Sequence, residues 1–203
     1  MTSALFTIGH STHTIERFVT LLTQNAVTAV ADVRSVPASR FTPQFNRVAL
    51  TRSLKDAGIK YVFLGRELGA RSDDPSCYID GQVQYDRLAR TTVFGQGIKR
   101  LLTGSESESI AIMCAEQEPL DCHRTVLVSR VLAEQGAPVV HIHGDGALET
   151  HDDAMLRLRT SFGLDHEDLF HTGEELLDQA LTRQERRIAY VDKDWRTREA
   201  KHG

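Results

Sequence analysis

The chain has 203 residues, of which 40% are hydrophobic and 26% charged, and its net charge is −4. This length can bury the core of one α/β domain, and the composition is typical of a soluble globular protein. The net negative charge argues against a general affinity for nucleic acid.

The sequence also predicts where in the cell the protein is located. No apolar run approaches the roughly 20 residues that span a bilayer, and the N-terminus lacks the basic and apolar segments of a secretory signal. The three cysteines are not spaced as a disulfide framework, which fits a reducing environment. We therefore expect a cytoplasmic protein with no membrane contact.

Apolar runs and amphipathic patterns alternate along the chain. The runs predict strands at residues 4–8, 27–30, 60–64, 110–113 and 139–143. The patterns predict helices at 15–24, 50–57, 85–102, 123–135 and 174–190, the third of them broken into two at glycines 95 and 97. Residues 70–82, which hold Cys77, are expected to form a mobile excursion.

The alternation of strands and helices favours a parallel sheet covered on both faces. We expect one α/β domain over residues 1–190, with three α/β/α layers, a mainly parallel sheet and a helical C-terminal extension. Residues 191–203 are expected to form a polar tail that frays.

A polar cluster follows each predicted strand directly. The clusters are GHS at 9–11, DVRS at 32–35, GRE at 65–67, the loop from Cys114 to Arg124, and HGDG at 143–146. Ligands of open parallel sheets bind outside the carboxyl ends of the strands. We therefore expect the five clusters to converge on one crevice.

The densest group of reactive side chains lies in the segment 109–130. Cys114 ends the strand, where a thiolate could act as a nucleophile, and Cys122 competes for the same role. Both could equally be inert packing residues. Glu116 and His123 are candidate proton-transfer groups. The free N–H groups of the next helix's first turn attract anions, and Arg124 would strengthen that attraction.

A metal ion is the alternative use of these residues. Soft ligands would come from Cys114, Cys122 and His123, and the set could be completed by His10, His141 or His143. His141 and His143 are two residues apart on a predicted strand and so project from one face. No C-x-x-C or H-E-x-x-H pattern specifies the metal.

The remaining candidate residues point to ligand binding. Asp32 and Arg34 share one strand face and form either an anion-binding pair or an internal ion pair. Further ligand-binding candidates are His10, Ser11, Arg40, Arg66 and Glu67. Arginine grips carboxylate or phosphate in a bidentate fork, so a small anionic molecule is the expected ligand.

Several motifs are shared with one known family. They are Thr7-Ile8-Gly9-His10-Ser11, Asp32-Val33-Arg34, Ser39-Arg40, Leu64-Gly65-Arg66-Glu67-Leu68-Gly69, Met113-Cys114-Ala115-Glu116 and Cys122-His123-Arg124. The later Gly144-Asp145-Gly146 and the segment from Gln184 to Tyr190 look similar too. On these motifs the chain resembles the bacterial domain of unknown function 488 family over nearly its whole length. The resemblance implies that the polar positions form a site, and it implies no particular reaction.

More loosely, the element order resembles the rhodanese and cysteine-phosphatase style of α/β fold, where a cysteine after a central strand begins an anion-cradling loop. Here eight positions separate Cys114 from Cys122, and Glu116, Glu118 and Asp121 make the loop acidic. Acidic neighbours would repel phosphate and raise the pKa of a thiol.

Three functions follow from these residues. The first is a small enzyme, a thiol-dependent transferase or hydrolase, acting on a polar, anionic or nucleotide-like group. The second is a non-catalytic module that binds a metal or metal-containing cofactor through the Cys/His cluster. The third, least favoured by the net charge, is a nucleic-acid-binding protein. The apolar stripe of the C-terminal helix would also suit a homodimer.

Overall fold

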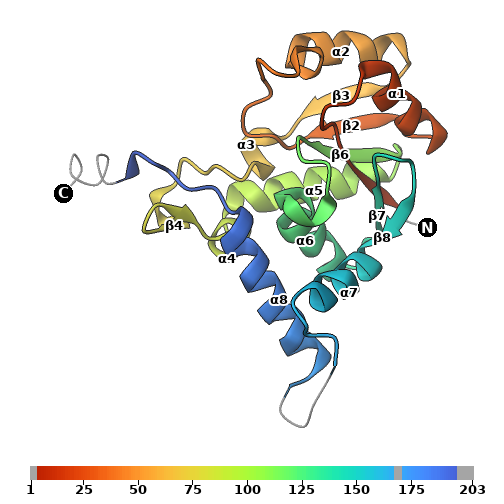
Figure 1. Cartoon of the computed structure of the whole chain (residues 1–203). Coiled ribbons are helices and arrows are strands. Elements are labelled where there is room, and N and C mark those ends of the chain that lie inside the picture. The colour runs from red at the N-terminus through yellow and green to blue at the C-terminus, as the bar shows by residue number, and fades with distance from the viewer. Residues whose placement is uncertain (1–3, 167–170, 196–203) are drawn as a thin grey trace.

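The computed structural model describes residues 4–166 and 171–195, and it places one six-stranded sheet at the centre of the protein (Figure 1). The strand order is β3-β2-β6-β1-β7-β8. The strands are β1 (Leu5–Gly9), β2 (Ala29–Asp32), β3 (Lys60–Phe63), β6 (Ile110–Cys114), β7 (Val139–Ile142) and β8 (Leu148–Thr150). Adjacent strands are parallel, except that β8, which the sequence did not predict, is antiparallel to β7. The predicted α/β class and the mainly parallel sheet are confirmed.

Helices cover both faces of the sheet and make the three layers. They are α1 (Ile15–Gln24), α2 (Arg47–Asp56), α3 (Gly65–Leu68), α4 (Tyr85–Ala89), α5 (Thr92–Ser105), α6 (Arg130–Glu134), α7 (His151–Ser161) and α8 (Gly173–Ile188). Helices α1 and α2 lie on one face of the sheet, and α5, α6 and α7 lie on the other (Figure 1). Their buried side chains belong to two separate core clusters, one on each face. None of these helices is long and apolar enough to cross a bilayer.

Strand β6 lies between β2 and β1 and is buried along its whole length. Side chains alternate between the faces of a strand. Ala111 and Met113 therefore join the α1/α2 core, whereas Ile112 and Cys114 join the α5/α6 core. This register directs the Cys114 side chain toward the loop that leads into α6.

The two helices predicted over residues 85–102 are present as α4 and α5, but the break between them lies at residues 90–91, and α5 runs unbroken through glycines 95 and 97. A Cβ at Gly97 would lie 2.7 Å from the Leu68 side chain, so the glycine allows α3 and α5 to pack closely. The expected excursion at 70–82 instead forms a short turn and the hairpin of β4 (Tyr78–Ile79) and β5 (Gln82–Val83), with Cys77 buried.

The C-terminal extension packs on the domain. Helix α8 begins with a capping box between Thr172 and Glu175 and contacts α7. The chain then returns to the hairpin, where Val191 bridges Gln82 and Trp195 stacks on Tyr78 with ring centroids 5.1 Å apart. Residues 191–195 are thus packed against the domain. The rest of the expected polar tail, 196–203, lies outside the described residues.

Candidate functional site

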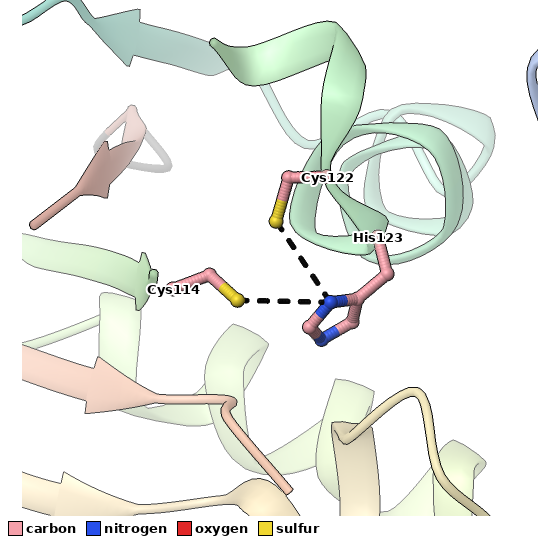
Figure 2. A group of neighbouring side chains, drawn as sticks. All are labelled: Cys114, Cys122 and His123. Atoms are coloured by element: carbon pink, nitrogen blue, oxygen red, sulfur yellow. Dashed lines mark hydrogen bonds between the residues drawn. The ribbon is translucent and has the colours of Figure 1, made fainter. Parts of the chain in front are cut away.

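Two cysteines and a histidine meet at the carboxyl end of β6 (Figure 2). Nδ1 of His123 lies 3.7 Å from Sγ of Cys114 and 3.8 Å from Sγ of Cys122. All three atoms lie within 4.8 Å of one another, and all three residues are buried. The structure therefore brings together the three soft ligands that the sequence singled out.

Local backbone structure sets these positions. Cys114 ends β6, and a short turn at Pro119–Asp121 carries the chain to Cys122. A π-helical segment, Arg124–Ser129, follows His123 and leads into α6. Single π-helical turns recur at functional sites because they reorient side chains within a helix. Here Cys122 and His123 precede that segment directly and face the end of β6.

The ring of His123 is held in one orientation. Its Nε2 lies 3.2 Å from the carbonyl oxygen of Val33, which accepts a hydrogen bond, so Nε2 carries a proton. The other nitrogen, Nδ1, is therefore the atom presented to the two sulfurs. A backbone carbonyl that fixes the second ring nitrogen is the usual outer partner of a metal-binding histidine.

The pKa values of Cys114, Cys122 and His123 depend on one another. Burial opposes ionisation of Cys122, but the Cys114 thiol, Arg124 and His123 outweigh it and hold the Cys122 pKa well below its ordinary value. The hydrogen bond to Cys122, together with burial, raises the pKa of Cys114. Burial lowers the His123 pKa, but Cys122 outweighs this effect and raises it. Of the two thiols, Cys122 is therefore the one that ionises first.

Glu116 completes the cluster on the loop side. Its Oε2 lies 3.0 Å from Sγ of Cys122. Burial of the carboxyl group and the charge of Cys122 raise the Glu116 pKa. A carboxyl group whose pKa is raised holds its proton more readily and can donate it to a neighbouring group.

Arg124 lies next to the cluster but does not point into the pocket. Its side chain is fully buried, and its guanidinium donates to the carbonyl oxygens of Glu116 (2.7 Å) and Gln117 (3.1 Å). The amides after Cys122 are occupied as well, since Arg124 N–H lies 3.5 Å from Cys122 Sγ and Thr125 N–H bonds the Cys122 carbonyl. The Arg124 guanidinium is thus turned toward the loop, which it holds in place, and it does not line the pocket.

Asp32 and Arg34 form an internal ion pair. Arg34 Nη2 lies 2.6 Å from Asp32 Oδ2, and both residues are buried. Tyr61 donates to the same carboxylate oxygen at 2.8 Å, and His10 Nε2 lies 3.1 Å from Arg34 Nη1. Of the two interpretations that the sequence left open, the geometry favours the internal pair.

A pocket of about 250 Å³ opens above the cluster. The predicted residues that line it are Arg34, Cys114, Glu116, Cys122 and His123. Its other walls include Arg71, Tyr85 and Tyr190, which the sequence analysis missed. No motif marks Arg71 or Tyr85, which come from the supposed excursion and α4, while Tyr190 ends the segment from Gln184 that resembles the family.

The other candidates lie elsewhere. Arg40 and Arg66 are exposed and do not line the pocket, while Glu67 pairs with Arg100. Ser11 donates a long hydrogen bond of 3.3 Å to Gln117. The five polar clusters thus converge only in part.

The histidines of β7 are also separate from the cluster. His141 contacts Thr7 and His151 in the core, and His143 pairs with Glu149 beside a different hollow that Gly144 and Asp145 line. The cluster of possible metal ligands in the described residues includes neither of them, nor His10.

Comparison with models of known families places the chain in one of them. A family model described as "Domain of unknown function DUF488" matches residues 14–131, more than half of the chain, and this span includes the whole Cys/His cluster. Comparisons with curated proteins and with solved structures give no significant match, so the looser rhodanese-like resemblance stays a prediction. The chain belongs to the DUF488 family.

Proposed function

We propose that this protein is a small hydrolytic enzyme that uses one transition-metal ion, held by Cys114, Cys122 and His123, to act on a polar or anionic small molecule. The observation that carries the proposal is the convergence of three buried soft ligand atoms within 4.8 Å of one another at the floor of a pocket. Thiolate and imidazole ligands together suit zinc and similar ions.

The spacing of the ligand atoms supports a tetrahedral ion. Zinc–sulfur bonds of about 2.3 Å and zinc–nitrogen bonds of about 2.0 Å at tetrahedral angles separate sulfur from nitrogen by about 3.6 Å. The two such distances are 3.7 and 3.8 Å. An ion could therefore sit between these atoms with shifts of a few tenths of an ångström.

Three protein ligands would leave a fourth position for water, as in catalytic zinc sites. A bound Zn²⁺ lowers the pKa of such a water to about 7 and so supplies a nucleophile at neutral pH. Glu116 lies beside Cys122, where its carboxyl group could accept and return a proton during hydrolysis. These roles fit a hydrolysis and require no redox partner.

The test is the metal content of purified protein, measured by mass spectrometry, and the visible spectrum after Co²⁺ is added to the metal-free form. We expect one ion per chain and tetrahedral Co²⁺–thiolate absorption. Replacing Cys114, Cys122 or His123 singly (Cys→Ser, His→Gln) should abolish stoichiometric binding. The variant Cys77→Ala is the matched control, since Cys77 is also buried but lies outside the cluster.

Protein with no bound metal, whose melting temperature is unchanged by added Zn²⁺, Co²⁺ or Fe²⁺, would overturn this proposal, because an ion that binds only the folded state must stabilise it.

Thiol chemistry is the second candidate, and the lowered pKa of Cys122 favours it. In this case Cys122 is the nucleophile and Glu116 the proton donor. Alkylation rates measured against pH, with and without a chelator, separate the two proposals. Fast labelling of Cys122 well below a free thiol's pKa of about 8.5, unaffected by the chelator, supports the thiol. Protection that the chelator removes supports the metal.

A further inference from the structure

Arg71 is a basic side chain at the pocket that has no acidic partner within the described residues. It is exposed, lines the pocket, and lies with its guanidinium 4.5 Å from the centroid of the Tyr190 ring. Arg34, the other arginine of the lining, is neutralised by Asp32. A stacked guanidinium keeps its N–H fork free, and that fork matches an oxyanion.

The backbone fixes Arg71 next to the end of β2. The Arg71 N–H donates to Ser35 Oγ at 3.1 Å, and Gly69 lies against the same hydroxyl group. The stacking on Tyr190, from the C-terminal extension, orders the side chain itself. Arg71 is therefore held between two elements, unlike an arginine on an open surface.

Tyr85 supplies a second polar group at the pocket. Its side chain is 1% exposed and lines the pocket, yet its hydroxyl group has no hydrogen-bond partner within residues 4–166 and 171–195. The hydroxyl group is not one of the fully buried, unpaired polar atoms of the described residues, so it opens onto the pocket and can donate to a ligand there.

The charges of the pocket are arranged unequally. Glu116, Asp121 and Cys122 belong to the loop side of the pocket, whereas Arg71 is a lining cation with no acidic partner within the described residues. An anionic group is attracted by Arg71 and disfavoured beside the Cys122 thiolate and the carboxyl groups of the loop. A ligand with one anionic end would thus bind in a single direction.

We propose that the substrate is a phosphate-bearing small molecule whose phosphate binds Arg71, while its uncharged reactive part points inward past the Tyr85 hydroxyl group to the Cys/His cluster. The orientation rests on the proposed function, since the inner end is where the reaction would occur. The phosphate site itself depends only on Arg71 and its neighbours. The volume of about 250 Å³ limits the ligand to a small molecule.

The test is the affinity for inorganic phosphate, measured by calorimetry on metal-loaded protein at low ionic strength. Arg71→Ala should weaken binding at least about tenfold, and Arg71→Lys should restore only part of it, because lysine lacks the fork. Arg52→Ala is the matched control: Arg52 is an exposed arginine on α2 outside the pocket, and its loss should leave the affinity unchanged. Tyr85→Phe should also leave it unchanged, since phosphate alone occupies the outer end.

Wild-type phosphate affinity in Arg71→Ala would overturn the inference. If Arg71→Ala has no effect but Tyr85→Phe or Cys122→Ser lowers the affinity, phosphate binds at the inner end of the pocket. That result would also overturn the inference. Metal content, measured on the same samples, reports on the proposed function separately. Arg71-dependent phosphate binding to protein without metal would support this inference while the metal proposal failed.

Discussion

The position of the Cys/His loop depends on two contacts of the Glu116 backbone carbonyl. It accepts from Arg124 Nη1 at 2.7 Å and lies directly over Gly9 at the end of β1. A Cβ built on Gly9 would lie 1.8 Å from that oxygen, far inside van der Waals contact. Glycine at position 9 therefore allows β1 and the loop after β6 to approach closely enough for Arg124 to hold the loop.

Gly9→Ala should displace this carbonyl and break its bond to the buried guanidinium of Arg124. We expect a loss of at least about 2 kcal/mol in the free energy of unfolding, combining overpacking with a weakened charged hydrogen bond. Metal affinity should fall with it, because the same loop carries Glu116 and leads to Cys122. Urea denaturation and metal titration measure the two effects.

Gly95→Ala is the control for Gly9→Ala. A Cβ at Gly95, in the exposed part of α5, meets nothing within 4 Å. It should raise the free energy of unfolding by up to about 1 kcal/mol, since alanine is the better helix former. Equal stability of the two variants would show that the contact over Gly9 is not tight in solution.

A series of buried hydrogen-bonded side chains joins β1, β7 and α7. Thr7 Oγ1 lies 2.8 Å from His141 Nδ1, and His141 Nε2 lies 3.2 Å from His151 Nδ1. Burial lowers the pKa of His141 to about 3 and that of His151 to about 4. Both rings are therefore neutral near pH 7, and a shared proton between them satisfies both nitrogens.

This pair predicts that acid weakens the folded state. Because the folded pKa values lie below the unfolded value of about 6.5, the unfolded chain binds more protons between pH 4 and 6.5, and stability falls as the pH drops through this window. Each histidine should cost about 2 kcal/mol between pH 7 and pH 5.

Replacing His151 by Gln should flatten the pH dependence of the free energy of unfolding by about that amount. Urea denaturation at several pH values measures it. His166→Gln is the control, since the His166 side chain is 93% exposed. A pH dependence in His151→Gln as steep as in the wild type would contradict the assignment.

At the scale of the whole molecule, the strands and the residues at their ends could be predicted from the sequence, but the order of the strands could not. Apolar runs located β1, β2, β3, β6 and β7, and Cys114, Cys122, His123 and Glu116 do lie together. The insertion of β6 between β2 and β1 depends on long-range packing. That order leaves the HGDG cluster one strand beyond β1, beside its own hollow.

The outer half of the pocket was not predictable for a related reason. Arg71, Tyr85 and Tyr190 are distant in sequence, and no local pattern distinguishes them from surface residues. They meet because α8 packs on α7 and the chain after it returns to the β4–β5 hairpin, where Val83 N–H donates to the Tyr190 carbonyl at 3.0 Å. Tertiary packing, rather than motif, builds the wall of the pocket opposite Arg34.

Helix α8 also reaches the cysteine loop through Gln184, which is 2% exposed. Its Nε2 donates to the Leu120 carbonyl at 2.8 Å and to Asp121 Oδ1 at 3.0 Å, just before Cys122. Gln184→Met keeps the volume but leaves the Leu120 carbonyl unpaired, which should cost about 1–3 kcal/mol of stability.

If α8 positions the loop, Gln184→Met should also weaken metal binding or raise the pH at which Cys122 is alkylated. Gln179→Met, a change at a half-buried residue of the same helix, is the control and should do neither. Denaturation and metal titration on both variants measure this. A Gln184→Met protein that loses stability but binds metal as the wild type does would make α8 a support of the fold alone. A loss of both would make the C-terminal extension part of the site, because the loop would then need α8 to hold Cys122 opposite Cys114.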